Sequence, residues 1–155
     1  MRVIGIDPGI EKVGFAIVDH IKGKTTVLDC GCIKTSKTLS TPERLVQIAE
    51  DLEEIIAQWQ PKAAGIEELF FSKNVKTALT VAHARGVIVS VLAKSKMKIV
   101  ELNPRTVKNA MTGDSKANKK QMQKMLQYTT GIRLKNDDTI DAVCIALCLT
   151  PTMLT

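Results

Sequence analysis

The chain has 155 residues, of which 45% are hydrophobic and 25% are charged. This length fits one domain, expected to span residues 1–155, and the composition excludes collagen-like, coiled-coil and disordered chains. The first residues contain no long apolar segment, and the longest apolar run, residues 86–93, is far shorter than the roughly 20 residues of a membrane span. We therefore expect a cytoplasmic protein with no signal peptide and no membrane partner.

The four cysteines form two closely spaced pairs. Cys30 and Cys32 are two residues apart, and Cys144 and Cys148 are four apart. A C-x-C sequence on a strand has poor geometry for a structural zinc site, which usually uses C-x₂₋₄-C turns. The spacing predicts buried reduced thiols that act as small apolar residues rather than zinc ligands.

The net charge of +6 is unevenly distributed along the chain. Residues 72–135 contain 14 Lys and Arg but only two acids, so this segment carries +12 and the remainder carries −6. Such asymmetry within one domain predicts a polyanion-binding face beside an acidic site, the alternative being lysines that only solvate exposed helices. Aromatic residues make up only 3%, which argues against extensive base stacking.

The first third of the chain is predicted to form strands. Apolar segments at residues 2–7, 12–20 and 25–35 are separated by Pro8-Gly9 and by a turn at residues 21–24. Connections this short require antiparallel pairing, because a parallel return needs a crossover of about a dozen residues or more.

The apolar spacing then changes to a helical period that ends before Pro61. A short buried strand follows, reached by a helical crossover and therefore expected to run parallel to the first strand. The remaining segments are predicted as a helix over 74–93, a strand over 98–102, a short helix through 111, a basic helix over about 117–129 and a final helix over about 137–149.

This order, three strands and then alternating helices and strands, predicts an α/β fold with a mixed five-stranded sheet flanked by helices. Three antiparallel strands come first and parallel strands follow, as in ribonuclease H-like folds. The absence of helices between the first three strands disfavours a doubly wound parallel fold.

Four acidic residues are predicted to meet at one edge of this sheet. Asp7 ends the first strand, Glu67 ends the strand expected beside it, and Asp138 and Asp141 share one face of the last helix. Carboxylates this close take up protons unless a cation neutralises them. Two Mg²⁺ ions about 3.5–4 Å apart would satisfy the cluster and would clamp both oxygens of an in-line phosphoryl displacement.

Each acid also has a purely structural interpretation. An Asp before Pro-Gly often forms a turn, and Asp137-Asp138 at a helix start often complements the helix dipole. Asp137 competes with Asp138 for the role of ligand, because residues 137 and 141 are also neighbours on a helix face. Periodicity leaves these two alternatives open.

A series of motifs extends over nearly the whole chain. They are Ile4-Gly5-Ile6-Asp7-Pro8-Gly9, Gly14-Phe15-Ala16, Ile66-Glu67-Glu68-Leu69-Phe70, Ala84-Arg85-Gly86, Val107-Lys108, Gly113, Lys119-Lys120-Gln121 and Asp138-Thr139-Ile140-Asp141-Ala142. In order and spacing, these motifs make the sequence resemble the RuvC family of Holliday junction resolvases.

The resemblance implies a ribonuclease H-like nuclease domain, a homodimer and paired symmetric nicks in four-way DNA junctions during recombination and repair. It places the catalytic, metal-binding acids at Asp7, Glu67, Asp138 and Asp141, and so favours Asp138 over Asp137. It implies two Mg²⁺ ions per active site, with Mn²⁺ as a possible substitute, and a branch-migration helicase complex as partner. Phosphate-contacting lysines fall on Lys108 and Lys119, and the junction-wedging aromatic falls on Phe70, with Phe71 as the alternative.

Two further features fit this interpretation. Lys116, Lys119, Lys120 and Lys124 follow helical spacing and predict a basic stripe that positions nucleic acid, with Met122, Met125 and Leu126 on the other side. The helix over 74–93 has two apolar stripes, of which one can pack on the sheet. The resemblance favours the other as the dimer interface.

Two other function classes remain in competition. One is a related ribonuclease H-like nuclease that acts on RNA, and the other is a non-catalytic nucleic-acid-binding module on the same fold. The complete set of four acids argues against a simple binding module, which has no need of carboxylates facing phosphates. Lys108, Lys119 and the acids of the last helix favour the junction enzyme over the RNA nuclease.

Overall fold

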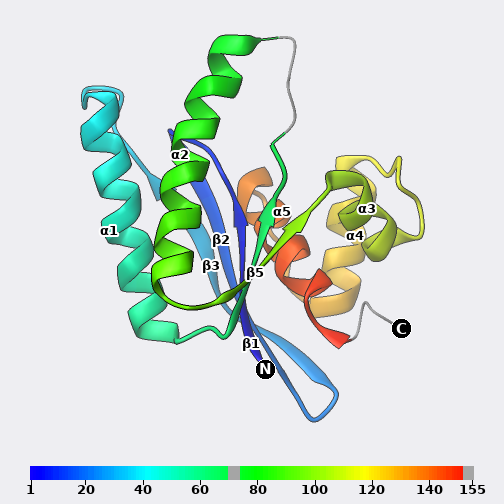
Figure 1. Ribbon diagram of the computed structural model, residues 1–155. Helices are drawn as coiled ribbons and strands as arrows, with labels where there is room; N and C mark the ends of the chain where they lie inside the picture. The colour runs from blue at the N-terminus through cyan, green and yellow to red at the C-terminus, as the bar shows by residue number, and fades with distance from the viewer. Residues whose placement is uncertain (70–73, 152–155) are drawn as a thin grey trace.

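The computed structural model describes residues 1–69 and 74–151, in which one five-stranded sheet is flanked by helices (Figure 1). This is the predicted mixed α/β architecture, and the boundaries differ from expectation by only one or two residues. The elements are β1 (Arg2–Asp7), β2 (Lys12–Ile21), β3 (Lys24–Lys34), α1 (Thr41–Trp59), β4 (Ala63–Glu67), α2 (Val75–Lys94), β5 (Lys98–Leu102), α3 (Pro104–Thr112), α4 (Lys119–Thr130) and α5 (Asp137–Cys148).

The sheet has the strand order β3-β2-β1-β4-β5. β2 pairs antiparallel with both β1 and β3, whereas β4 runs parallel to β1 on one side and to β5 on the other. The predicted mixture of antiparallel and parallel strands is therefore confirmed. Because β1 and β4 are parallel neighbours, their final residues, Asp7 and Glu67, lie at the same edge of the sheet.

Local sequence signals explain where the first crossover helix begins and ends. Ser40 caps α1: its hydroxyl accepts from the Glu43 N–H, and the Glu43 carboxylate accepts from the Ser40 N–H at 2.7 Å. This reciprocal capping box satisfies two backbone donors that the first turn would otherwise leave unpaired. Gln60 ends the helix in the left-handed conformation, immediately before Pro61.

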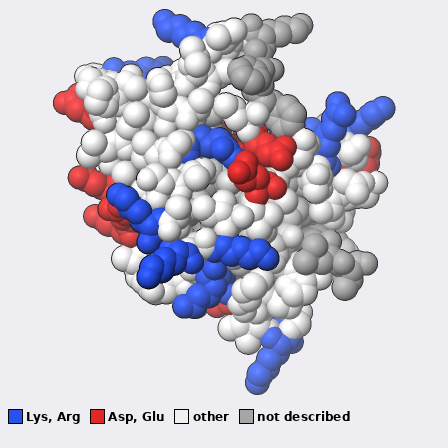
Figure 2. Space-filling model, viewed as in Figure 1, with Lys and Arg blue, Asp and Glu red and all other residues white. Residues whose placement is uncertain are grey.

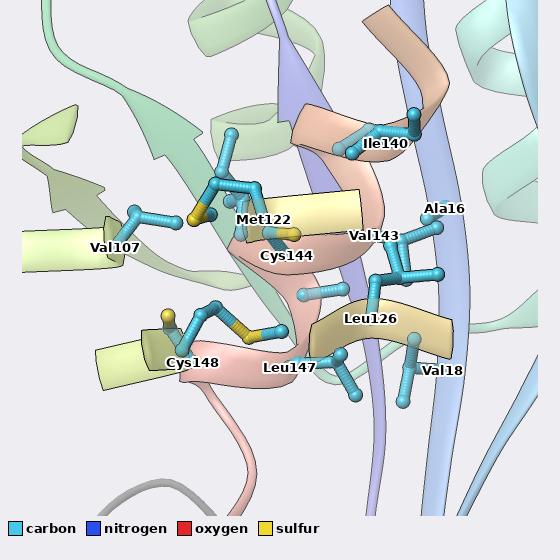
Figure 3. Packing of buried hydrophobic residues seen from close by; sticks show 14 of the residues in the cluster. Ala16, Val18, Val107, Met122, Leu126, Ile140, Val143, Cys144, Leu147 and Cys148 are labelled. Carbon is cyan, nitrogen blue, oxygen red and sulfur yellow. The ribbon is translucent and has the colours of Figure 1, made fainter. Parts of the chain in front are cut away.

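Both faces of the sheet are covered, because alternate residues of each strand point to opposite sides. Ile4 and Ile6 of β1 belong to a buried cluster that includes side chains of α1 and α2. Val3, on the other face of β1, joins Ala16 and Val18 in a cluster built with α3, α4 and α5 (Figure 3). The sheet thus separates two apolar layers, which hold its edges in fixed positions.

Helix α5 lies unusually close to the sheet. All its residues from Thr139 to Cys148 are buried except Asp141. A Cβ atom added to Gly5 of β1 would lie 2.1 Å from the Ala142 carbonyl oxygen, so glycine is required for this approach. The backbone of α5 is therefore held against β1.

The cysteine prediction is correct for one pair and wrong in part for the other. Cys144 and Cys148 are buried in α5, and burial raises the pKa of the Cys148 thiol to about 11. Cys30 and Cys32 are only partly buried, because β3 is an edge strand that α5 covers incompletely. Cys30 still packs against the cluster beneath α5.

The two apolar stripes of α2 have different environments. Ala84, Ile88 and Leu92 are buried between α1 and the sheet, whereas Val75 and Leu79 of the other stripe are 62% and 56% exposed. Among the described residues, α2 forms the one helix whose length and apolar composition would suffice to cross a membrane. In this fold it packs against α1 and leaves an apolar surface uncovered.

Candidate active site

The first two acids are brought together by the parallel pairing of β1 and β4. Ile6 lies opposite Ile66, so the next residues, Asp7 and Glu67, leave the sheet side by side. A hydrogen bond joins their two side chains. Two carboxyl groups can form such a bond only while they share a proton.

The third acid reaches the cluster through the close packing of α5 on β2. Asp7 is paired with Gly14 of β2, and a Cβ atom added to Gly14 would lie 2.1 Å from the Asp138 carbonyl oxygen. The start of α5 is therefore in contact with the strand position beside Asp7. Asn136 fixes this start, because its side chain accepts the Thr139 N–H at 3.1 Å.

Asp141 follows one turn later on α5 and stays in contact with solvent, although its neighbours on the helix are buried. It faces the same cleft as Glu67. Asp137 also lines this cleft, but its carboxylate is 2.5 Å from the Lys119 ammonium. The two competing aspartates therefore have different surroundings: Asp138 lies against β2 and Asp137 is paired with a lysine.

The four acids act on one another electrostatically. The pKa of Asp7 is raised to about 8, first by burial and then by the charges of Glu67, Asp141 and Asp138. Burial and the Asp141 charge also raise the pKa of Glu67. The pKa of Asp141 is raised by desolvation, then by the Asp137 carboxylate, while Lys119 and Lys108 oppose the shift. At neutral pH the metal-free cluster therefore retains a proton on Asp7.

The donor set fits a hard divalent cation, because Mg²⁺ prefers carboxylate oxygens and its charge would replace the shared proton. Within residues 1–69 and 74–151, no three His, Cys, Asp or Glu side chains already stand close enough to hold an ion as a group.

A cleft of about 480 Å³ adjoins the acids. Its lining includes Glu67, Asp137 and Asp141 together with basic side chains from α3, α4 and the loop before α5. Its basic lining residues are Lys108, Lys119, Lys120 and Lys135. A cleft lined by both acids and lysines suits a phosphodiester that must be held by cations beside a metal site.

The lysines predicted to bind nucleic acid have different positions. Lys108 acts on the charges of both Glu67 and Asp141, and Lys119 and Lys120 line the cleft. Lys116 was expected on the same helical stripe, and this is wrong: α4 begins at Lys119, and Lys116 lies in the preceding loop with its N–H bonded to Asp114. Asn118 caps α4, which fixes the helix start after Lys116.

The described basic residues of the +12 segment are divided between the two ends of the sheet. Lys98 opens β5 opposite Ala63, at the end of the sheet remote from Glu67, and Lys94 ends α2 at that same end. Figure 2 shows that basic side chains on the viewed side gather in several separate places. Of the segment's described residues, Arg85 of α2 and the cleft-lining lysines between α3 and the loop before α5 lie beside the acids.

Other predicted residues and contacts extend this description. Phe70 and Phe71, the alternatives for the junction wedge, lie outside the described residues. Lys135 lines the cleft but was not singled out from the sequence, where it was one of 14 basic residues. The Lys119–Asp137 pair was also missed, since 18 residues separate its members and no local pattern connects them. The helical spacing of the lysines predicted a basic surface here, but it indicated neither the place of Lys135 nor the pairing of Lys119 with Asp137.

A mixed five-stranded sheet of this order, with acids from β1, β4 and the final helix at one edge, is the arrangement of ribonuclease H-like nucleases. The family model described as crossover junction endodeoxyribonuclease RuvC matches residues 3–149. The chain belongs to this family, which confirms the resemblance read from the sequence.

Individual relatives agree with this assignment. Crossover junction endodeoxyribonuclease RuvC of Roseiflexus sp. (strain RS-1) is 44% identical over 151 residues, covering 96% of this chain and 90% of the relative. The T. thermophilus RuvC structure in complex with a Holliday junction substrate matches with a TM-score of 0.89 and 29% identity, covering 95% of this chain and 91% of that one. A second Thermus thermophilus RuvC structure matches with a TM-score of 0.86 and 30% identity, covering 95% of this chain and 92% of that one. The yeast mitochondrial resolvase Ydc2, at 16% identity and a TM-score of 0.68, shares the fold.

Proposed function

We propose that this protein is a structure-selective endonuclease that resolves four-way DNA junctions by paired symmetric nicks in recombination and repair. The observation that carries the proposal is the convergence of Asp7, Glu67, Asp138 and Asp141 beside a cleft lined by lysines. Membership of the RuvC family supports DNA as the substrate. The junction complex of the T. thermophilus relative supports the four-way form of that DNA.

The four acids are proposed to hold two Mg²⁺ ions, with Mn²⁺ as a substitute. When bound, such ions lower the pKa of a water nucleophile and stabilise the attacking and leaving oxygens of the phosphodiester. Asp7 has the central place in this arrangement, because the charges of the other three acids all act on it. Asp7 must lose its proton before it serves as a ligand, so metal binding releases a proton from the Asp7–Glu67 pair.

The lysines would hold the scissile strand against the acids. Lys108 lies close enough to Glu67 and Asp141 for its charge to oppose the rise in the pKa of each, so a phosphate beside Lys108 is also beside the acids. Lys119 and Lys120 extend the contact along α4, and Lys116 is available from the loop before it. Phosphate contacts of this kind fix the position of the duplex without reading its sequence.

Paired nicks require two active sites, and we propose that the protein acts as a homodimer. The exposed apolar stripe of α2, which includes Val75 and Leu79, supports an interface on that helix. A twofold symmetric interface would present two equivalent cleavage sites to a junction with two equivalent strands. A branch-migration helicase complex remains the further partner expected from the family resemblance.

The direct test is to incubate the protein with Mg²⁺ and a synthetic four-way junction, a linear duplex of the same sequence, and an RNA hairpin. We expect paired nicks at symmetric positions of the junction and little cleavage of the other two substrates. Preferential cleavage of RNA would support the related ribonuclease. Tight junction binding by the wild type, with no cleavage under any divalent metal, would support a binding module and contradict the proposal.

A further inference from the structure

Arg85 of α2 reaches the end of the strand that carries Glu67. Its Nε donates a hydrogen bond to the Glu67 carbonyl oxygen at 3.2 Å, and its Nη2 lies 2.5 Å from a carboxylate oxygen of Glu101 on β5. The Arg85 side chain is only 19% exposed. Burying most of the Arg85 side chain costs free energy of desolvation, which its two hydrogen-bond partners, at the end of β4 and on the neighbouring β5, offset.

The geometry makes these contacts a clamp across two strands and a helix. Glu101 is paired with Ile66, the residue before Glu67, so the guanidinium spans β5 and β4 while it is anchored in α2. The planar, forked guanidinium can satisfy a carboxylate and a carbonyl at once in a fixed orientation, which lysine cannot do. The orientation of the Glu67 peptide group is thereby tied to both neighbours.

The residue after Glu67 is held in the same way. The Glu68 N–H donates to the Leu102 carbonyl at 3.0 Å, and the Asn103 amide donates to the Glu68 carboxylate at 3.3 Å. Asn103 also caps α3, the helix that carries Lys108. The backbone on both sides of the Glu67 side chain is thus fixed by groups from α2, β5 and the start of α3.

We propose that Arg85, oriented by Glu101, is the positioning residue for Glu67. By fixing the peptide group at the end of β4, it directs the Glu67 carboxylate toward Asp7 and sets the metal affinity of the pair. The inference rests on the proposed metal-dependent function. Ligands must be held within about 0.5 Å of their working geometry, and the loss of an outer partner that orients a metal ligand typically costs 10–100-fold in affinity or activity.

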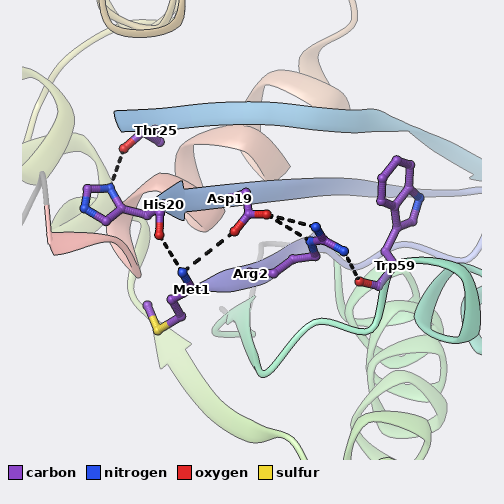
Figure 4. A network of polar contacts seen from close by, with 6 residues as sticks. All are labelled: Met1, Arg2, Asp19, His20, Thr25 and Trp59. Carbon is purple, nitrogen blue, oxygen red and sulfur yellow. Dashed lines mark hydrogen bonds and ion pairs between the residues drawn. The ribbon is translucent and has the colours of Figure 1, made fainter. Parts of the chain in front are cut away.

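A matched control exists at the opposite end of the sheet. Arg2 also joins a carboxylate and a backbone carbonyl: its Nη2 lies 2.9 Å from Asp19, and its Nη1 donates to the Trp59 carbonyl at 2.8 Å (Figure 4). Arg2 contacts none of the four acids. The variants Arg85→Gln and Arg2→Gln therefore remove similar interactions, one beside Glu67 and one far from it.

The experiment measures Mn²⁺ binding to the protein without DNA by calorimetry, junction binding in EDTA, and the Mg²⁺ concentration for half-maximal nicking. The variants are Arg85→Gln, Arg85→Lys, Glu101→Gln and Arg2→Gln. We expect Arg85→Gln to weaken Mn²⁺ binding by about 10-fold or more. It should raise the half-maximal Mg²⁺ concentration in proportion and leave junction binding in EDTA within about twofold. Excess metal should restore nicking, Glu101→Gln should give a smaller shift in the same direction, and Arg2→Gln should give none.

Two results would overturn the inference. Unchanged Mn²⁺ affinity in a folded Arg85→Gln protein would mean that Arg85 only stabilises the fold. A loss of junction binding in EDTA with normal Mn²⁺ affinity would instead make Arg85 a DNA contact. If Arg85→Gln does not fold, Arg85→Lys and Glu101→Gln give the same two readouts. Calorimetry needs no cleavage, so failure of the wild type to cut junctions would contradict the proposed function while the clamp is still tested.

Discussion

The two ends of the β1–β2 pair place a carboxyl group in opposite electrostatic surroundings. At one end, Asp19 is buried but lies 2.9 Å from the Arg2 guanidinium and 3.7 Å from the amino terminus (Figure 4). At the other end, Asp7 is surrounded by three more acids, and its pKa is raised to about 8. Asp7 lies on β1 and Asp19 lies on the neighbouring β2, so the difference comes from the groups that the fold packs beside each carboxyl group.

Within one sheet, the paired Asp19 contributes to stability, whereas the acids around Asp7 are placed for function. Burial of a carboxylate costs free energy unless a cation or hydrogen-bond donors compensate it, and Asp19 has such partners. Asp7 has none of comparable strength in the metal-free protein and retains a proton instead. A folded chain keeps a cluster of this kind only at some cost to its stability, which is the mark of a site built for an external cation.

The largest expected effect distinguishes the two consecutive aspartates of α5. Asp138→Asn should lower Mg²⁺-dependent junction nicking by about 10²–10³-fold or more, because it removes an acid from the cluster around Asp7. Its matched control is Asp137→Asn, which loses the pair with Lys119 and a charge at the helix start. The control should keep near-normal turnover and lose at most about 1 kcal/mol of stability. An inactive Asp137→Asn with an active Asp138→Asn would reverse the assignment.

At the end of the sheet that carries Asp19, a substitution should change stability rather than activity. Asp19→Asn leaves Arg2 and the amino terminus without a carboxylate and should lower the free energy of unfolding by about 1–3 kcal/mol, since the Arg2 side chain is partly solvated. Urea denaturation measures the loss. Nicking well below the melting temperature should stay near the wild-type rate. A strong loss of nicking by a folded Asp19→Asn protein would break the division between the two ends.

The pH dependence of stability should report the raised pKa of Asp7. Because the folded-state pKa of Asp7 is about 8 and its ordinary value is 3.8, the folded protein holds a proton that the unfolded chain loses between these values. The free energy of unfolding therefore falls as pH rises toward 8, by about 1–3 kcal/mol in EDTA. Asp7→Asn should flatten this dependence. Identical profiles for wild type and Asp7→Asn would contradict the raised pKa.

The smallest effect concerns the lysines that line the cleft. Junction affinity should fall with salt, with a log–log slope of about −0.9 per phosphate neutralised, and Lys119→Gln should reduce the steepness by about one unit. Lys98→Gln, at the remote end of the sheet, is the control and should leave the slope unchanged. Equal changes for both variants would mean that the whole +12 segment contacts DNA.

Much of the fold was accessible from the sequence because its signals are local. The change from alternating to helical apolar spacing fixed the order of elements, and short connections required antiparallel β1–β3 pairing. Pro61 marked the end of the first helix. The start of α4 was misplaced, since the lysine spacing continues into the loop that holds Lys116, while the Asn118 cap ends that loop.

The site was accessible only in part. Convergence of the four acids follows from strand ends and helix faces, and the family resemblance decided between Asp137 and Asp138. Contacts between distant segments were not accessible: Arg85 with the Glu67 carbonyl, Lys119 with Asp137, and the Gly14 contact that sets α5 beside Asp7. These depend on the register of the sheet and on packing distances, which no single segment encodes.

If the clustered acids perform the chemistry and the Arg2-paired Asp19 does not, the same substitution at Asp7 and at Asp19 must have opposite effects on activity. Asp7→Asn and Asp19→Asn each replace one carboxyl group on neighbouring strands, so junction nicking in Mg²⁺ by the two folded variants, beside junction binding in EDTA, tests this division most directly. Asp7→Asn is predicted to bind the junction at least as tightly as wild type and to cut it at background rate, while Asp19→Asn cuts normally. Near wild-type nicking by Asp7→Asn would contradict the account.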